Sequence, residues 1–377
     1  MRHPKLLIYV RAISGGAGKN AVKYANFLAE AGFEVMLTCA RAPLVDQFGL
    51  DARVALRVLG GRKSLTITRA LRRQLAAFAP EICLVVDASN LPAILLALPA
   101  CPQRPTLVLR EALSTRARLE QRAKVKQWLK RPVHVLGYRR TDHIIALTQH
   151  MRDELVHYWH QPQRKITVIP NGIACPDTRA EPHQRARPYI LCVSRLEAQK
   201  DIPTLLNAFA TVRRAHDCQL LIAGAGRDQA RLEALSARLG LVADVEFLGH
   251  VSDPGALYAG AQIAVLSSLW EGFPNVVIEA LAHGTPVVAT RTPGAVEILD
   301  GTECGLLANL GDAPDLARQM EAALTKDWDS TTLLDRATDF SDMRLRTTVT
   351  AFFSGLCSAG DIEAASHRLA PGEPGAH

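Results

Sequence analysis

The sequence predicts an α/β protein made of two doubly wound domains, each with a parallel sheet covered by helices. Short apolar segments alternate with amphipathic helical segments in both halves of the 377 residues, which is typical of such sheets. A polar stretch that contains proline, residues 173–188, separates the two series and is expected to be a linker. The length also fits two or three domains.

The N-terminal domain is expected to span residues 1–172. It begins with a buried strand at 6–10, a glycine-rich loop at 14–18 and a helix at 20–31 whose apolar residues recur at helical spacing. Gly32 ends this helix, because glycine adopts the left-handed conformation that closes many helices. The other strands expected in this half are 33–39, 82–86, 106–109, 143–147 and 165–169.

The C-terminal domain is expected to span residues 189–345. Its predicted strands are 189–193, 219–223, 245–248, 263–266 and 287–290, and its predicted helices are 202–216, 228–239, 254–259, 275–283 and 315–324. Residues 346–377 are expected to form a C-terminal helix and a flexible tail, since the stretch from 358 is rich in Ala, Gly, Pro and Ser. Doubly wound sheets bind ligands beyond the carboxyl ends of their strands, so we expect a cleft between the domains.

The composition argues against several classes of protein. No apolar run approaches the length of a membrane span, and the N-terminal run at 6–10 is too short for a signal-peptide core, so we expect a cytoplasmic protein. The eight cysteines form no Cys-x-x-Cys pair, so neither a disulfide framework nor a metal site is predicted. Residues 104–140 carry eleven Lys or Arg and two Glu, a charge of +9 against +7 for the whole chain. A single basic segment with few aromatic residues fits an anionic surface better than a nucleic acid.

The most informative segment is 268–290, where a loop with Gly272 and Pro274 leads from a strand into a helix that starts near Asn275. Such a loop presents free backbone N–H groups and a helix N-terminus to an anion. Glu271 and Glu279 flank this position. A carboxylate beside a phosphate is repelled unless it accepts hydrogen bonds from neutral hydroxyls, so sugar and ribose hydroxyls are the expected partners.

Two cations follow the strand at 189–193. Arg195 and Lys200 lie between this strand and the next helix, a position that suits a bound diphosphate. Negative charge grows on the leaving oxygen as a nucleoside diphosphate departs, and fixed cations stabilise that transition state. Each charged residue taken alone could be a surface group, but together Arg195, Lys200 and Glu271 are the predicted catalytic residues.

Three motifs carry a family resemblance: S-R-L-x-x-x-K at 194–200, F-L-G at 247–249 and E-G-F-P-N-x-x-x-E at 271–279. Together they resemble the retaining glycosyltransferases of family 4, which have the GT-B fold. The resemblance implies that Arg195 and Lys200 hold the donor diphosphate, that Glu271 contacts the transferred sugar and that Glu279 binds the nucleotide ribose. The other donor-binding residues it implies are Gly15, Gly16, Gly249, His250, Gly272, Phe273, Pro274, Asn275 and Val276.

The resemblance also implies a reaction. A hexose or N-acetylhexosamine would move from a nucleotide-diphosphate sugar, with UDP favoured over GDP, to a glycan acceptor with retention of configuration, and no other cofactor is implied. The departing diphosphate would accept the proton of the attacking hydroxyl, so no protein nucleophile is required. The alternatives are the same chemistry on a soluble acceptor, or a non-catalytic partner subunit that binds the sugar nucleotide. A sugar-nucleotide epimerase is disfavoured because no acid/base pair is evident.

The resemblance is looser over the N-terminal half, where a histidine typical of the family is not evident. Many relatives carry a His near the reacting sugar, in the loop after a middle strand. The corresponding loops of this chain carry Asp87 and Asn90, or Arg110 and Glu111. These four residues are therefore the candidates for the acceptor side of the site.

Residues 114–131 are predicted to form a basic amphipathic helix. Arg118, Arg122, Lys126 and Lys130 recur every four residues, and Lys124, Trp128 and Arg131 complete the candidate patch. A basic helix with an interfacial Trp is typical of binding to an anionic membrane, although a solvated face would show the same pattern. This reading favours a lipid-linked acceptor and a peripheral position on the inner face of the cell membrane.

Overall fold

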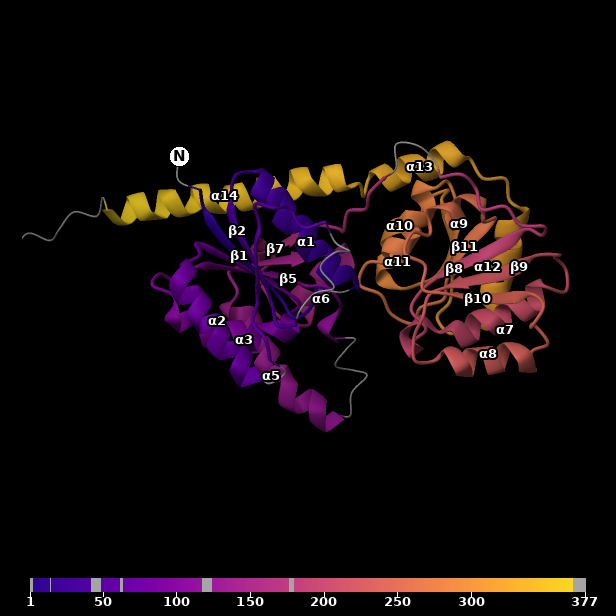
Figure 1. The fold of residues 1–377 in the computed structure, drawn as a ribbon, viewed down its shortest axis with the longest axis horizontal. Helices are drawn as coiled ribbons and strands as arrows, with labels where there is room; N and C mark the ends of the chain where they lie inside the picture. The colour runs from indigo at the N-terminus through magenta and orange to yellow at the C-terminus, as the bar shows by residue number, and fades with distance from the viewer. Residues whose placement is uncertain are drawn as a thin grey trace, which may run out of the picture.

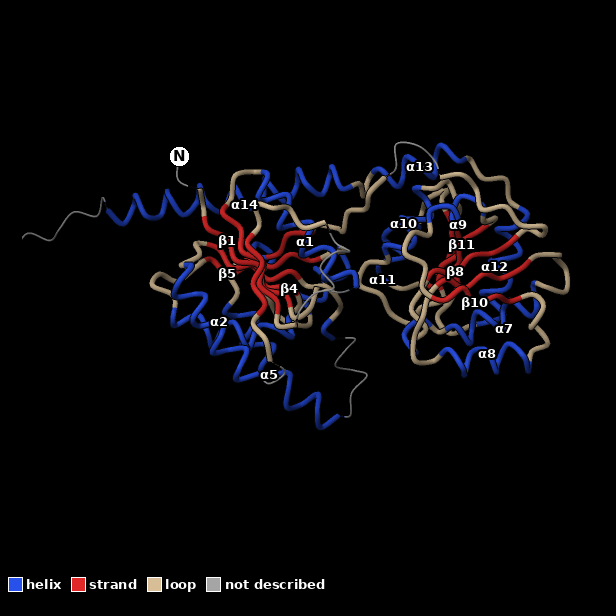
Figure 2. The backbone as a smooth tube through the Cα atoms, in the orientation of Figure 1, coloured by secondary structure: helices blue, strands red, loops and turns tan. Residues whose placement is uncertain are grey.

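The computed structural model describes residues 3–13, 15–41, 49–61, 64–116, 124–175 and 180–368. It contains two α/β domains that lie side by side, each built on one parallel sheet with helices on both faces (Figures 1 and 2). The predicted fold class is confirmed.

The N-terminal sheet has seven strands in the order β3-β2-β1-β4-β5-β6-β7, all parallel. Its strands are β1 Lys5–Val10, β2 Glu34–Cys39, β3 Ala55–Val58, β4 Ile82–Val86, β5 Thr106–Arg110, β6 His143–Ala146 and β7 Ile166–Val168. Every predicted strand is present because central parallel strands are near-continuous apolar runs, and all five residues of β4 are buried. The edge strand β3 was not predicted, since it is short and only half covered.

The helices of this domain are α1 Gly15–Glu30, α2 Ser64–Phe78, α3 Leu91–Ala97, α5 Lys124–Arg140 and α6 Gln149–His157, with short 3₁₀ turns at Ala88–Asn90, Leu98–Ala100 and Gln163–Lys165. The predicted start of the first helix is wrong by five residues. Gly15 and Gly16 already belong to its first turn, and the Asn20 amide donates to the Gly16 carbonyl oxygen at 2.9 Å. The glycines therefore place a helix N-terminus, rather than a loop, beside the cleft.

The C-terminal sheet has six strands in the order β10-β9-β8-β11-β12-β13. They are β8 Tyr189–Val193, β9 Gln219–Ala223, β10 Val245–Gly249, β11 Ile263–Leu266, β12 Val287–Thr290 and β13 Gly305–Ala308. The helices are α7 Ile202–Val212, α8 Gln229–Arg238, α9 Gly255–Gly260, α10 Asn275–Ala282, α11 Pro293–Leu299, α12 Ala313–Thr325 and α13 Ser330–Thr338, and a 3₁₀ turn spans Ala198–Lys200. The strand order reverses between β8 and β11, which is where such sheets bind ligands.

The last helix, α14 Asp342–Arg368, returns to the N-terminal domain and lies along it (Figure 1). Its residues Leu345, Val349 and Phe353 are buried in the N-terminal core. The helix is longer than predicted, because it continues through residues 358–368, which were expected to belong to the tail. Residues 369–377, the rest of that tail, lie outside the described residues.

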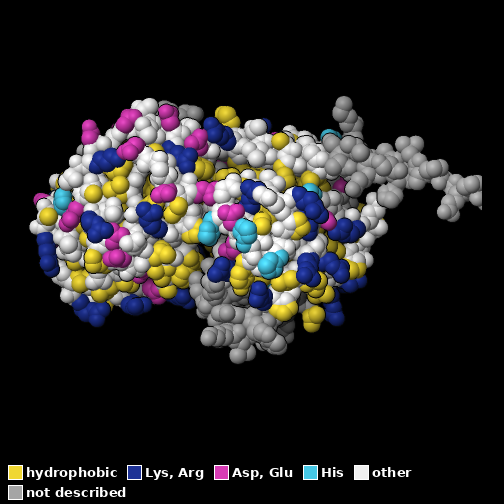
Figure 3. Space-filling view, turned by 180° about the vertical axis from the view of Figure 1, so that it is seen from behind, with side chains coloured by type: hydrophobic (Ala, Val, Ile, Leu, Met, Phe, Trp, Pro, Cys, Tyr) yellow, Lys and Arg dark blue, Asp and Glu magenta, His cyan; other side chains and the backbone are white. Residues whose placement is uncertain are grey.

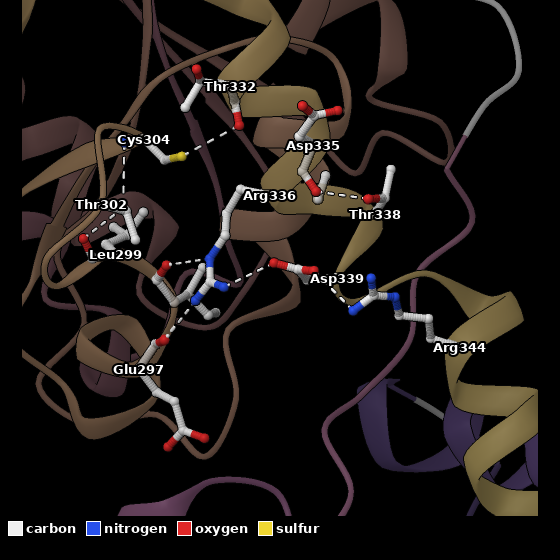
Figure 4. A network of polar contacts seen from close by, with 12 residues as sticks. Glu297, Leu299, Thr302, Cys304, Thr332, Asp335, Arg336, Thr338, Asp339 and Arg344 are labelled. Atoms are coloured by element: carbon white, nitrogen blue, oxygen red, sulfur yellow. Dashed lines mark hydrogen bonds and ion pairs between the residues drawn. The ribbon is translucent and has the colours of Figure 1, made fainter.

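The segment that leads from the N-terminal to the C-terminal domain is joined to the segment that returns to α14. Ile173 forms a bridge with Ser341, and its N–H donates to the Phe340 carbonyl oxygen at 2.9 Å. Arg336 of α13 fixes this region, as Figure 4 shows: it donates to the carbonyl oxygens of Glu297 and Ile298 at the end of α11, each at 3.0 Å. Asp339 accepts from Arg336 at 3.0 Å and pairs with Arg344 of α14 at 2.9 Å. The crossing is therefore tied to the C-terminal domain by an ion-pair network.

Candidate functional site

A cleft of about 530 Å³ lies where the carboxyl ends of strands from the two domains face each other. It is lined from both domains by sequence-predicted residues, namely Gly15, Gly16, Asp87, Arg110, Arg195, Lys200, Glu271, Asn275 and Val276. Further lining residues that the sequence did not single out are Ala17, Asn20, Ala112, Leu113, Leu147, Asn171 and Gln199. The candidates for the diphosphate and for the sugar are thus brought to one cavity.

Lys200 and Glu271 form the polar centre of the C-terminal wall. The Lys200 ammonium lies 2.5 Å from Glu271 Oε1, and the Ser268 hydroxyl donates to the same oxygen at 2.7 Å. The side chains are only 12% and 9% exposed, so this ion pair is largely shielded from water. The carboxylate is held by two donors on one oxygen, which leaves lone pairs of the other for a hydroxyl of a ligand.

The two loops that carry this pair are tied together by their backbones. Gln199 accepts at its carbonyl oxygen from the Leu269 N–H at 2.9 Å, and its side chain donates to the Trp270 carbonyl oxygen at 2.7 Å. The Ser267 hydroxyl donates to the Lys200 carbonyl oxygen at 2.8 Å. Because these loops follow β8 and β11, the neighbouring strands at the reversal of order, the topology itself brings the cation and the carboxylate together.

Arg195 follows β8 on the same wall and has a different environment. Its side chain is 63% exposed and pairs with Glu197 at 3.1 Å. An exposed pair of this kind is weak and exchanges partners at little cost. The guanidinium is therefore available to an anion that enters the cleft.

Glu279 lies one turn into α10, behind the cleft. Its carboxylate accepts from the Tyr258 hydroxyl at 3.3 Å. Burial raises the pKa of Glu279 above its ordinary value, while the charges of Lys19 and Lys23 on α1 and the hydrogen bond from Tyr258 act in the opposite direction. Lys19 and Lys23 belong to the N-terminal domain, so the proton affinity of Glu279 is set partly across the domain boundary.

A chain of polar side chains crosses the cleft. Arg110, at the end of β5, is buried and donates to the Asn171 amide oxygen, and Asn171 donates to Asn275 Oδ1 at 2.8 Å. The Arg110 guanidinium also lies 5.4 Å from the centre of the Tyr24 ring. Asn275 is the first residue of α10, so these hydrogen bonds connect the N-terminal sheet to the helix that follows the β11–α10 loop, residues 267–274.

Gly272, in the loop between β11 and α10, lies close to the N-terminal domain. A Cβ atom at this position would lie 2.4 Å from the Ala112 carbonyl oxygen and 3.2 Å from Leu113. Such a separation is shorter than atoms tolerate, so the loop can reach the opposite domain only with glycine here.

Other predicted site residues lie outside the cleft. Gly249 and His250 are at the end of β10, on the edge of the sheet, and His250 is exposed. Phe273 and Pro274 are buried residues of the β11–α10 loop, and they do not line the cleft. The Asn90 amide, which donates to the Val86 carbonyl oxygen at 2.6 Å, lines a neighbouring pocket.

Glu111 is adjacent to Arg110 in sequence but faces the interior. Its carboxylate accepts from the Thr115 and Tyr138 hydroxyls within the N-terminal domain. The structure therefore places Glu111 in the core of that domain, away from the cleft.

The predicted basic helix is only partly described. Arg118 and Arg122 lie outside the described residues, as do the side chains of Lys124, Lys126, Trp128 and Lys130. The described helix begins at Lys124 and continues to Arg140, so the predicted end at 131 is wrong. Arg131 is exposed, and its guanidinium lies 5.0 Å from the centre of the Tyr158 ring.

The two domains match two family models. Residues 14–175 match the model described as Glycosyltransferase Family 4, and residues 187–326 match the model described as Glycosyl transferases group 1. Together the models span most of the chain. The protein therefore belongs to glycosyltransferase family 4 and has the GT-B fold.

Individual relatives agree with this membership. The chain is 30% identical over 211 residues to the lipopolysaccharide core biosynthesis glycosyltransferase LpsE of Rhizobium meliloti, a match that covers 54% of this chain and 60% of the relative. It is 34% identical over 168 residues to the phosphatidyl-myo-inositol mannosyltransferase of Mycobacterium leprae, covering 42% and 44%. The chain thus spans about half the length of these curated relatives.

Solved structures share the fold over nearly the whole chain. Sucrose-phosphate synthase from Thermosynechococcus elongatus superposes with a TM-score of 0.82 at 19% identity, covering 95% of this chain and all of that one. HepE from Anabaena in complex with UDP and glucose superposes with a TM-score of 0.78 at 18% identity, covering 94% and 100%.

Proposed function

We propose that this protein is a retaining glycosyltransferase that moves a hexose or N-acetylhexosamine from a nucleotide-diphosphate sugar, UDP-linked in preference to GDP-linked, to a glycan acceptor. The observation that carries the proposal is the shielded Lys200–Glu271 pair at the reversal of strand order, with Arg195 beside it in the interdomain cleft. A cation that can turn to a diphosphate and a carboxylate that can accept sugar hydroxyls are the two elements that donor binding requires.

In the proposed reaction, the acceptor hydroxyl oxygen forms a bond to the anomeric carbon on the face that the diphosphate leaves. The bond between that carbon and the diphosphate oxygen breaks, and the leaving diphosphate takes the proton of the hydroxyl. Lys200 and Arg195 stabilise the negative charge that grows on the leaving group. Glu271 orients the transferred sugar through its hydroxyls, and Glu279 accepts hydrogen bonds from the ribose.

We also propose that the acceptor is lipid-linked and that the N-terminal domain binds an anionic membrane from its cytoplasmic side. The described end of α5 exposes Val133 and Leu136, 47% and 54% exposed, next to Arg131, Arg139 and Arg140. In Figure 3, Lys and Arg side chains lie among apolar side chains over part of this domain. Basic and apolar groups on one helix support interfacial binding. None of the described helices combines the length and apolar character that crossing a bilayer requires.

The first test is a calorimetric titration with UDP and with GDP in the presence of EDTA. We expect one nucleotide, UDP, to bind wild type, and Glu279→Ala to weaken that binding at least tenfold because the ribose hydroxyls lose their acceptor. Glu233→Ala, an exposed carboxylate of α8, is the matched control and should bind as wild type does. If neither nucleotide binds, the proposed function is wrong.

Membrane binding is tested by flotation with vesicles that contain anionic or only neutral lipid. The triple variant Arg131→Glu, Arg139→Glu, Arg140→Glu should lose binding to anionic vesicles and keep UDP binding. Arg231→Glu, Arg238→Glu on α8 is the control. Equal flotation of both variants would contradict a membrane surface on α5.

A further inference from the structure

A second pocket, of about 260 Å³, adjoins the donor cleft on the N-terminal domain. It lies beyond the carboxyl ends of β1, β2 and β4, where the order of the N-terminal sheet reverses. Ala17 and Asp87 line both this pocket and the donor cleft, so the two cavities share a wall. A ligand in this pocket would therefore lie next to the position of the transferred sugar.

Two cations line the pocket. Arg11 follows β1 and Arg41 follows β2, and both side chains are exposed. Within the described ranges, neither guanidinium forms a hydrogen bond or an ion pair with another side chain. Asp87 is the one carboxylate among the lining residues, so the charge of the described pocket wall is positive.

The backbone of Asp87 is strained. Its φ of 76° and ψ of 128° are rare for a residue other than glycine, and such strain costs on the order of 1–3 kcal/mol. The conformation is held because the Asp87 N–H donates to the Arg110 carbonyl oxygen and the Asp87 carboxylate accepts from the Ser89 N–H, each at 2.8 Å. The chain thus keeps a costly conformation at the residue that separates the two cavities.

We propose that this pocket binds a phosphate group of the acceptor through Arg11 and Arg41, and that Asp87 positions the acceptor hydroxyl at the boundary with the donor cleft. Two guanidiniums fit the several oxygens and the double charge of a phosphate better than they fit a neutral sugar or a single carboxylate. This inference rests on the proposed function, since it specifies the acceptor of the same reaction. It assigns the acceptor to the class of sugar phosphates or sugar diphosphates.

The test is a calorimetric titration of protein already saturated with UDP, so that the donor diphosphate position is filled. The probes are glucose 1-phosphate, glucuronate and methyl glucoside. We expect glucose 1-phosphate to bind, glucuronate to bind more weakly and methyl glucoside not to bind. Arg11→Gln and Arg41→Gln should each weaken glucose 1-phosphate about tenfold, the loss expected for one charge-assisted hydrogen-bonded contact, and leave UDP affinity unchanged. Arg57→Gln, an exposed arginine of β3, is the control.

The outcomes separate this inference from the proposed function. If UDP binds but glucose 1-phosphate does not, or binds equally to Arg11→Gln, Arg41→Gln and wild type, the pocket is not a phosphate site and the proposed function stands. If neither UDP nor GDP binds, the proposed function is wrong, and a titration without nucleotide still reports on the pocket. A second titration uses a polyprenyl-diphosphate sugar in micelles. If it binds more tightly than glucose 1-phosphate, with the same dependence on Arg11 and Arg41, the phosphate belongs to a lipid carrier. Equal binding of the two probes assigns the phosphate to a soluble acceptor.

Discussion

The ammonium of Lys200 and the carboxylate of Glu271 lie 2.5 Å apart at the ends of two neighbouring parallel strands. Both side chains are nearly buried, so each charge depends on the other for its stabilisation in the absence of ligand. Under the proposed function, an entering diphosphate would give Lys200 a second anion and free Glu271 to accept sugar hydroxyls. The pair therefore keeps a charged site stable while it is empty.

Breaking this pair should destabilise the fold. We expect Lys200→Met to lower the free energy of unfolding by about 3 kcal/mol, because the Glu271 carboxylate is left buried and uncompensated. The double variant Lys200→Met, Glu271→Leu should recover most of that stability but no transfer activity. Urea denaturation measures the first effect and a transfer assay the second.

An exposed ion pair is the control for this experiment. Arg291 and Asp300 are 50% and 57% exposed, so Arg291→Met should change stability by less than about 1 kcal/mol. Two results would contradict the mutual stabilisation of Lys200 and Glu271 in the free protein. One is a loss of unfolding free energy in Lys200→Met no larger than in Arg291→Met. The other is a double variant as unstable as Lys200→Met alone.

Donor binding should depend on pH through Glu279, whose pKa burial raises above the ordinary value of 4.5. As the pH falls through this raised pKa, the carboxylate gains a proton and becomes a poorer acceptor, so UDP affinity should decrease. Glu279→Gln has nothing to titrate there and should bind UDP weakly at every pH. Calorimetry at a series of pH values measures the UDP affinity of wild type and of Glu279→Gln. If the two affinities change with pH in the same way, the pH dependence belongs to another group.

The same shift has a consequence for stability, with a defined sign. Because the folded pKa lies above the unfolded one, the native state holds the proton more tightly, and this contribution is complete below pH 4.5. It is lost as the pH rises from 4.5 through the folded pKa. We expect Glu279→Gln to lack this decline, so the stability of wild type relative to the variant should fall across that window in urea denaturation at each pH.

The fold class could be predicted because a parallel sheet leaves a strong signal in the sequence. Each interior strand is buried on both faces and appears as a short apolar run, as in β4 and β8. The edge strand β3 has no such run, since its residues are half covered or exposed. The start of α1 was missed because glycine disfavours helices, and the tertiary position of Gly15 and Gly16 overrides that preference.

The C-terminal half of the site was easier to predict than the N-terminal half. Arg195, Lys200 and Glu271 lie in loops that directly follow strands, so the topology brings them together. Arg110 and Glu111 are consecutive residues where a strand ends, and successive side chains there point to opposite faces. Arg110 lines the cleft and Glu111 lies in the core, and composition and spacing alone do not show which of the two faces the cleft.

A methyl group at Gly272 should impair transfer more than donor binding. In Gly272→Ala the added Cβ atom would lie 2.4 Å from the Ala112 carbonyl oxygen, so the two domains would have to separate. We expect a decrease in transfer rate of at least tenfold with UDP affinity within about threefold of wild type, because a small misplacement of reacting groups is costly. Gly355→Ala on α14, where no atom lies within 4 Å, is the control. Wild-type activity of Gly272→Ala would show that this close approach is dispensable.

The return of α14 to the N-terminal domain should make its buried face essential for stability. Phe353 is fully buried and meets the Tyr24 ring edge to face, with ring centres 6.5 Å apart. Phe353→Ala should lower the free energy of unfolding by about 3–5 kcal/mol, the cost of deleting a large core side chain. Met343→Ala on the same helix, at a side chain 77% exposed, should have almost no effect.

Because α14 starts at the crossing next to Ile173, detaching it also frees the segment that orients the domains. Transfer activity of Phe353→Ala should therefore fall at urea concentrations at which UDP still binds the C-terminal domain. Coincident loss of binding and transfer would instead show that the two domains unfold as one unit.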